Sequence, residues 1–195
     1  AQFNFLGERP KTADCYYPIQ HPAVVDLFKK IDRRGHRIGF HPSREAFSDP
    51  RVFELELGSL RAASPQPVLH GRHHYLCFSA PDTWQRWAEA GLESDSTLGY
   101  PEQSGFRCGM CQSFPVFNFL TRKELPLREQ PLMAMEATLA QYNRYTPGQA
   151  LERLQALRRE VERHGGEFSL LWHNSSWNTY FWAPWQRVFL EFLKN

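Results

Sequence analysis

Apolar residues recur at helical spacing in several segments of the chain. The clearest segment runs from Pro147 to His164, where Ala150, Leu154, Leu157 and Val161 lie three or four positions apart. Such spacing places the apolar side chains on one face of a helix, and the following glycine pair provides a stop. The same pattern predicts further helices over residues 22–34, 49–60, 79–90 and 184–194.

Short apolar runs separate these helices and predict strands over residues 3–6, 36–40, 67–70, 132–135 and 168–172. Two stretches rich in turn residues, 7–19 and 92–129, predict loops. Strands that alternate with helices favour a mainly parallel α/β layer or barrel. No linker or repeat interrupts the pattern, so we expect a single domain over residues 1–195.

Composition narrows the classes of function. The chain has 195 residues, of which 42% are hydrophobic, enough for one domain with a core. The net charge of +2 is not the strong basic excess that is typical of nucleic-acid binding. The sequence has no apolar run long enough to span a membrane and no pattern typical of a signal peptide, so we expect a cytoplasmic protein.

Four cysteines, at positions 15, 77, 108 and 111, do not suggest a disulfide framework. Cys108 and Cys111 have C-x-x-C spacing, but a second close pair is absent and no strand-then-helix pattern frames them. We expect reduced thiols. A thiol-based redox protein remains a weaker alternative, supported by this spacing alone.

Ionisable residues follow several of the predicted strands. They are His41, the segment from Arg72 to Tyr75, Glu136 and His173. The carboxyl ends of parallel strands are where α/β proteins build active sites. One such histidine alone is more often an ordinary surface or hydrogen-bonded residue, but several together predict a functional site.

These segments resemble a known family. The sequence GHRIGFHPS, residues 35–43, resembles the RGHEIGxH motif of the polysaccharide deacetylases, the NodB-homology carbohydrate esterases. Other family motifs follow in order: AQFNFL resembles the ATFFV strand, RHHY the RxPY motif, LESDS the strand with the family's aspartate, and LLWH the LxLH motif. The segments HPS, HYLCFS, DSTLGY, GFRCGMC, PLMAME and LLWHNSS are similar to a divergent bacterial branch associated with lipopolysaccharide O-antigen and other surface-polysaccharide gene clusters.

The resemblance implies a distorted (β/α) barrel and metal-assisted N-deacetylation. His173 matches the general acid that protonates the departing amine, a role suited to a group that titrates near neutrality. Arg72 and Asp95 match the pair that holds the electrostatics of the site, which an arginine–carboxylate fork does by bidentate geometry.

The resemblance also implies a divalent metal ion, zinc before others. His41 matches the first histidine of the family's Asp-His-His triad, and Glu45 stands at the place of the second. His73 and His74 replace the middle residues of the RxPY motif, and one of them, His74 first, is a candidate substitute ligand or sugar contact, since glutamate oxygen and imidazole both bind divalent ions. The family's Asp-Asp motif, with the general base and one ligand, lies on a strand before AQFNFL, so we expect a barrel that lacks its first strand in residues 1–195.

Further residues are candidates for binding the substrate: Tyr75, Arg107, Glu136, Asn174 and Trp172. Each has a structural alternative. Arg107 and Glu136 are also suited to a buried ion pair, Asn174 to a turn cap, and Trp172 to packing.

The sequence therefore favours a metal-dependent hydrolase that removes an N-acetyl group from an amino sugar of a surface polysaccharide or its precursor. The alternative is a catalytically altered or inactive member that binds carbohydrate. Neither the sugar nor the oligomeric state follows from the sequence.

Overall fold

The computed structural model describes residues 1–6, 17–177 and 179–194. The loop expected at 7–19 lies mostly outside the described residues. The chain forms two compact units: Ala1–Thr97 with Phe114–Glu129, and Leu98–Ser113 with Gln130–Asn195. These are the first and the second unit. The expectation of a single domain stays a prediction.

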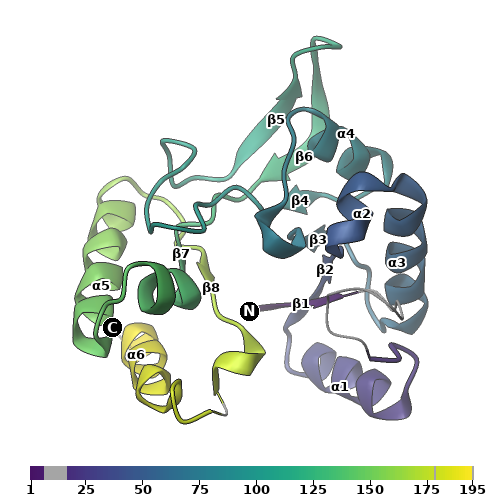
Figure 1. Cartoon of the computed structure of the whole chain (residues 1–195). Helices are drawn as coiled ribbons and strands as arrows, with labels where there is room; N and C mark the ends of the chain where they lie inside the picture. Colours follow the sequence, from purple (N-terminus) through teal and green to yellow (C-terminus); the bar gives the residue numbers. More distant parts are fainter. Residues whose placement is uncertain (7–16, 178, 195) are drawn as a thin grey trace. The chain divides into compact units, whose positions relative to one another are not determined.

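The first unit contains a six-stranded sheet in the order β1-β2-β3-β4-β6-β5 (Figure 1). Every neighbouring pair is parallel except β5 with β6, which is antiparallel. This confirms a mixed α/β fold with a mainly parallel sheet. The strands are β1 (Gln2–Leu6), β2 (Arg37–His41), β3 (His70–Gly71), β4 (Ser94–Asp95), β5 (Phe114–Asn118) and β6 (Lys123–Glu129).

The expectation of a loop over residues 92–129 is wrong, because this stretch contains β4, β5 and β6. The buried positions of β6 alternate strictly: Leu125, Leu127 and Glu129 face inward. Pro115 in β5 and Pro126 in β6 resemble turn residues in a sequence. An edge strand tolerates proline, which is how β5 accommodates its own.

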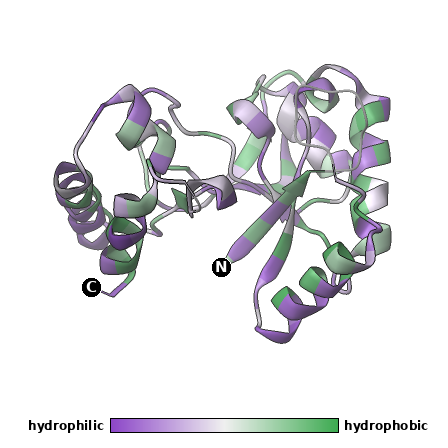
Figure 2. Ribbon diagram, turned by 60° about the horizontal axis from the view of Figure 1, so that its bottom comes forward, coloured by the Kyte–Doolittle hydropathy of each residue, from purple (hydrophilic) through white to green (hydrophobic). Residues whose placement is uncertain are grey.

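Among its described residues, the first unit also contains the α-helices α1 (Pro22–Arg33), α2 (Arg44–Ser48), α3 (Pro50–Ala63) and α4 (Asp82–Glu89). Capping explains where α3 begins: Pro50 occupies its first turn and the Asp49 side chain accepts the Arg51 N–H at 2.9 Å. Hydrophilic and hydrophobic residues lie side by side along the helices (Figure 2), as expected when one face packs on a core.

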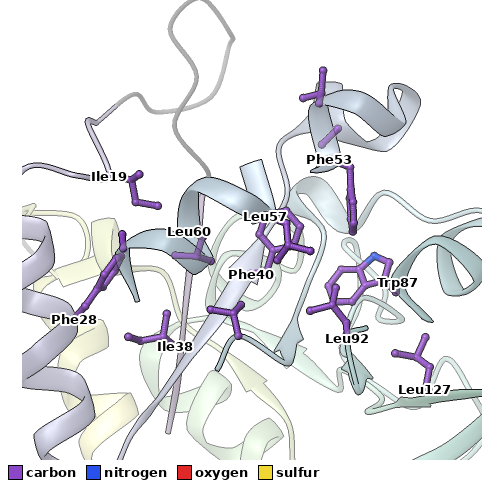
Figure 3. Close-up of a cluster of buried hydrophobic side chains, with 14 of the residues drawn as sticks. Ile19, Phe28, Ile38, Phe40, Phe53, Leu57, Leu60, Trp87, Leu92 and Leu127 are labelled. Carbon is purple, nitrogen blue, oxygen red and sulfur yellow. The ribbon is translucent and has the colours of Figure 1, made fainter. Parts of the chain in front are cut away.

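The core of the first unit joins the sheet to its helices. Phe40 of β2, Phe53 of α3 and Trp87 of α4 are fully buried and in mutual ring contact (Figure 3). A Cβ at Gly71 would lie 2.1 Å from the Phe40 carbonyl oxygen, so only glycine allows this approach of β3 to β2. The close approach of β3 to β2 brings together the residues that follow these two strands.

The second unit has a parallel pair of strands, β7 (Ala134–Met135) and β8 (Leu170–Leu171), with α5 (Pro147–Arg163) and α6 (Ala183–Lys194). It also has a π-helix, η2 (Thr138–Tyr142), and a 3₁₀ turn, η3 (Asn174–Trp177). A capping box of Thr146 and Gln149 begins α5. The predicted apolar stripe of α5, Ala150, Leu154, Leu157 and Val161, is buried.

The strands pair as one open sheet in the first unit and one strand pair in the second. The closed barrel that the resemblance implies is not seen and stays a prediction. Among the described residues, no helix combines the length and the apolar character that crossing a bilayer requires.

Candidate functional site

Two histidines follow neighbouring strands of the first unit and lie side by side. His41 ends β2, and His74 begins η1 (His74–Leu76), just after β3. Their ring centroids are 4.8 Å apart, and the His74 N–H donates to the Pro42 carbonyl at 3.1 Å. His41 Nδ1 lies 2.6 Å from the Arg72 carbonyl oxygen. Because a carbonyl only accepts, Nδ1 carries the proton and a neutral His41 keeps its lone pair on Nε2.

The third candidate ligand does not complete a metal site. Glu45 lies in the first turn of α2 with an exposed side chain. Within the described ranges, no group of three or more His, Cys, Asp or Glu side chains is arranged to hold a metal ion. His41 and His74 offer imidazole nitrogens, and His41 has the oriented Nδ1–H that metal-binding histidines show. The described residues therefore do not amount to a complete metal centre.

The segment after β2 is fixed by Glu56, a residue of α3 that sequence reasoning missed. Glu56 is fully buried; its two carboxylate oxygens accept the Ser43 N–H at 2.9 Å and the Ser43 hydroxyl at 2.6 Å. The Ser43 Oγ in turn accepts the Ala46 N–H at 3.2 Å and caps α2. The helical period places Glu56 on the same face as Phe53 and Leu60, which is the signal that could have revealed it.

Arg72 and Asp95 are buried after β3 and at the end of β4, but they do not form the expected fork. The Arg72 Nε donates to the Ser96 carbonyl at 2.8 Å. Asp95 Oδ1 instead accepts the Thr97 N–H at 3.1 Å and the Thr97 hydroxyl at 2.5 Å. The Asp95 Oδ2 has no hydrogen-bond partner. The two charged groups therefore interact through their electrostatic field and not through a direct ion pair.

Burial dominates the titration of both groups. It raises the pKa of Asp95 to about 7, although the Thr97 hydrogen bonds and the Arg72 charge lower it. It lowers the pKa of Arg72 to about 10, against the opposing effect of the charges of Asp95 and Glu129. The sequence does not indicate Glu129, because its pattern predicts a loop where β6 lies. It is fully buried at the end of β6 and accepts the Trp84 indole N–H at 3.0 Å.

His73 lies in the core and not in the site. Its ring is 1% exposed and is packed 5.6 Å from the Trp87 ring and 5.8 Å from the Phe47 ring, measured between centroids. Burial, with the nearby charge of Arg86, lowers the pKa of His73 to about 3. A neutral imidazole enclosed by aromatic rings is a packing residue, so of the two adjacent histidines only His74 remains a candidate ligand.

Tyr75 projects beside His74 on a strained backbone. Tyr75 and Leu76 have φ angles of 57° and 53°, a region that costs non-glycine residues about 1–2 kcal/mol each. The Tyr75 ring is 59% exposed; its centroid lies 4.2 Å from that of His74 and 5.9 Å from the Arg44 guanidinium carbon. Local strain that holds an exposed aromatic ring in place is typical of binding sites.

In the second unit, Glu136 and His173 form a close pair after β7 and β8. His173 Nδ1 donates to the Glu136 Oε1 at 2.6 Å, and the same oxygen accepts the His173 backbone N–H at 3.0 Å. The Ser176 hydroxyl is a third donor to it, at 2.7 Å. Glu136 is fully buried, whereas the His173 side chain is 37% exposed. The carboxylate thus fixes the ring while the ring remains accessible.

The charge of Glu136 is well supported by these contacts. Burial alone would raise the pKa of Glu136, but the hydrogen bond and charge of His173, with the Ser176 hydroxyl, outweigh it and lower the pKa below its usual value. An ionised Glu136 requires the proton on His173 Nδ1, so Nε2 is the atom that exchanges protons at the surface. Glu136 therefore supports His173, which differs from the direct substrate contact expected from the sequence.

The second unit contains three further candidates for binding the substrate, namely Asn174, Trp172 and Arg107. Asn174 follows His173 directly and is exposed. Trp172 is half-buried against Phe189, with ring centroids 5.0 Å apart. Arg107 is exposed; it donates to the Gly99 carbonyl at 2.9 Å and lies 5.7 Å from the Tyr100 ring centroid. This arrangement is not the buried ion pair with Glu136 that was one alternative for Arg107.

The C-x-x-C motif also belongs to the second unit. Cys108 and Cys111 are not joined in a disulfide. Cys111 is 4% exposed, and a Cβ on Gly166 would lie 2.3 Å from its sulfur. Cys111 is therefore a packed core thiol, whereas redox cysteines are accessible.

Comparisons with known proteins support the fold. No protein-family model and no curated protein matches the sequence. A crystal structure described as that of a "putative polysaccharide deacetylase" from Mycobacterium smegmatis is similar, with a TM-score of 0.61 and 16% sequence identity. The match covers 90% of this chain and 63% of that chain, so this chain spans less than two thirds of its structural neighbour. At this identity the likeness shows the fold alone.

Proposed function

We propose that this protein is a carbohydrate deacetylase that hydrolyses the N-acetyl group of an amino sugar in a surface polysaccharide, of the O-antigen type, or its precursor. The observation that carries the proposal is the Glu136–His173 pair, a buried carboxylate that orients an accessible imidazole after two parallel strands. The structural neighbour described as a polysaccharide deacetylase and the ordered motifs of the sequence support the same class of reaction.

The chemistry needs a proton donor at the departing nitrogen. Water adds to the acetamide carbonyl, the carbon–nitrogen bond breaks, and the products are acetate and a free amine. An amine anion is too basic to leave unprotonated, so a general acid must deliver a proton as the bond breaks. Protonated His173 supplies it from Nε2, while Glu136 Oε1 holds the Nδ1–H and stabilises the imidazolium.

The other candidates receive supporting roles in the proposal. Arg72 and Asp95 hold the segments after β3 and β4 through Ser96 and Thr97. Asn174 offers an exposed amide for sugar hydroxyls. Tyr75, Trp172 and Arg107 are proposed to contact the substrate, since aromatic faces stack on sugar rings and guanidinium groups donate to their oxygens.

Metal dependence is part of the proposal, with zinc as the first candidate and His41 and His74 as the imidazoles that would bind it. A bound divalent ion supplies polarisation of the carbonyl and a lowered pKa of water. The test dialyses the wild type and the His41→Ala variant against zinc and then compares the zinc content of the two proteins. We expect zinc in the wild type and its loss in the variant; equal content in both would remove His41 from the proposal.

The decisive test measures acetate release from a panel of N-acetylated amino-sugar oligosaccharides, with and without added divalent ions. The matched variant is His173→Asn, because an asparagine amide can still donate to Glu136 but has no counterpart of Nε2. We expect a loss of about 10²- to 10⁴-fold in kcat with little change in the unfolding midpoint. Absence of acetate release under all conditions, or an unchanged kcat in the variant, would contradict the proposal.

A second candidate is a carbohydrate-binding protein without catalytic activity. The observation that favours it is that the described residues provide no three-ligand metal group. It predicts that calorimetry on the same panel detects binding while no acetate is released. Acetate release that depends on His173 would contradict it.

A further inference from the structure

The β5–β6 hairpin of the first unit ends in a turn with unusual composition. The inward face of the hairpin packs normally, with Val116, Leu125 and Leu127 in the core. The turn at 118–123 extends away from the rest of the sheet (Figure 1). At or beside it Phe117 is 50% exposed, Phe119 55% and Leu120 71%. Turns are normally built from Gly, Pro, Asn, Asp and Ser, so three large apolar side chains at one tip need an explanation.

The turn does not need these side chains for its own structure. Asn118 Oδ1 accepts the N–H groups of Leu120 at 2.9 Å and Thr121 at 3.1 Å, which closes the turn. The Asn118 amide also donates to Gln85 of α4 at 2.7 Å and ties the turn to the unit. The polar groups thus set the backbone, and Phe119 and Leu120 are left pointing away from the core.

Cations follow the apolar tip directly. Arg122 and Lys123 are both exposed, with one exposed carboxylate, Glu124, after them. Apolar side chains next to Lys and Arg are the composition of segments that enter the boundary between lipid headgroups and acyl chains. The apolar groups leave water there, while the cations stay at the level of anionic headgroups.

Other occupants fit this tip less well. Strand addition to the β5 edge is hindered by Pro115 and by the irregular register between Pro115 and Phe117. A second copy of the chain, docked tip to tip about a two-fold axis, would place Arg122 and Lys123 against their own counterparts. Like charges would oppose that contact, whereas an anionic surface is complementary to it.

We propose that the β5–β6 tip docks on an anionic lipid surface, with Phe117, Phe119 and Leu120 in the headgroup boundary and Arg122 and Lys123 on the lipid phosphates. This docking does not depend on the proposed deacetylase activity. It would hold the first unit at a membrane without a spanning helix.

The experiment measures co-sedimentation of the full chain with phosphatidylcholine vesicles, with and without phosphatidylglycerol. We expect binding to the anionic vesicles that weakens as salt is added. Replacing Arg122 and Lys123 with glutamine should weaken it by about fivefold per cation. The double variant Phe119→Ser with Leu120→Ser should weaken it by about tenfold or more, and Glu124→Gln should strengthen it.

The matched control is Leu55→Ser, because Leu55 of α3 is 67% exposed and lies outside the hairpin. It should bind like the wild type. No binding to anionic vesicles at low salt, or equal losses in the tip and control variants, would overturn the proposal. Sedimentation velocity without lipid tests the alternative that a second copy of the chain occupies the tip. A dimer that is abolished by the Phe119→Ser, Leu120→Ser variant would assign the tip to a second copy and overturn lipid docking.

Discussion

Both units place ionisable residues after parallel strands, but they expose them differently. In the first unit Arg72 and Asp95 are 6% and 0% exposed. In the second unit Glu136 is equally buried, yet its partner His173 keeps 37% of its side chain exposed. A fully buried charge can hold segments in place but cannot reach a substrate. A buried carboxylate that carries an accessible imidazole can do both.

The difference extends to how each carboxylate is stabilised. Asp95 accepts the N–H and the hydroxyl of Thr97 on Oδ1, with a smaller contribution from the Ser96 backbone, yet burial outweighs these hydrogen bonds and raises its pKa to about 7. Glu136 receives three donors on one oxygen, two of them from His173, so its pKa falls despite burial. Glu136 gains the charge of His173 in addition to its hydrogen bonds, whereas for Asp95 burial outweighs both the hydrogen bonds and the charge of Arg72.

The largest expected effect is on the stability of the first unit. Arg72→Ala removes the cation that opposes the buried charge of Asp95, and we expect a loss of about 3–5 kcal/mol in the free energy of unfolding. Without Arg72 the pKa of Asp95 rises further above its unfolded value of 3.8. Between pH 5 and 7 Asp95 is protonated in both folded proteins, so the loss should stay nearly constant there and grow as the pH rises above about 7, where only the wild type ionises Asp95. Urea unfolding at several pH values measures it.

The control for this prediction is Arg37→Ala, since Arg37 of β2 is exposed. Its change should stay within about 0.5 kcal/mol. If Arg72→Ala lowers the free energy of unfolding by no more than the control does, the buried charges of the first unit do not hold its segments in place. The contrast drawn between the two units would then be wrong for the first unit.

Glu136→Gln should lower kcat for acetate release by about 10- to 100-fold with a smaller change in KM, because the amide no longer stabilises the imidazolium. The pKa of Glu136 is lowered in the fold, so its carboxylate adds stability above the unfolded value of 4.5 and loses it as pH falls through the folded value. The stability difference between wild type and variant should therefore shrink in acid. An unchanged kcat and pH–rate profile would reduce Glu136 to a packing residue.

The sequence predicts the local features of this fold better than the contacts between distant segments. The capping box and apolar stripe of α5 are both readable from residues within one helix. The Glu136–His173 pair joins residues 37 positions apart, and no local pattern shows that the two meet. Only the position of each after a predicted strand indicated a shared edge, because parallel strands β7 and β8 end together.

Burial was the feature that the sequence could not assign. His73 and His74 are adjacent and chemically equal, yet one lies among core rings and the other beside His41. His73 has an extended backbone, with φ −65° and ψ 138°, whereas His74 begins the 3₁₀ turn η1, so the two side chains leave the backbone in different directions. Glu129 was missed for a related reason, since its alternating strand carries a proline and resembled a loop.

The smallest effect at neutral pH is expected for His73→Phe, which tests whether a strand-end histidine of the first unit is a core residue. A volume-conserving aromatic replacement should change stability at pH 7 by less than about 1.5 kcal/mol. The pKa of His73 is about 3 in the fold against 6.5 unfolded, so the unfolded state takes up a proton first as pH falls. The wild type then loses up to about 1.4 kcal/mol per pH unit below 6.5, and the variant does not. Urea unfolding at pH 7 and pH 5 should show the variant gaining in relative stability.

His73→Leu should gain similarly in acid, because the effect depends on losing the titrating group and not on ring shape. A difference that is constant with pH would mean that His73 is accessible to protons in the fold, and would return it to the candidate ligands beside His41.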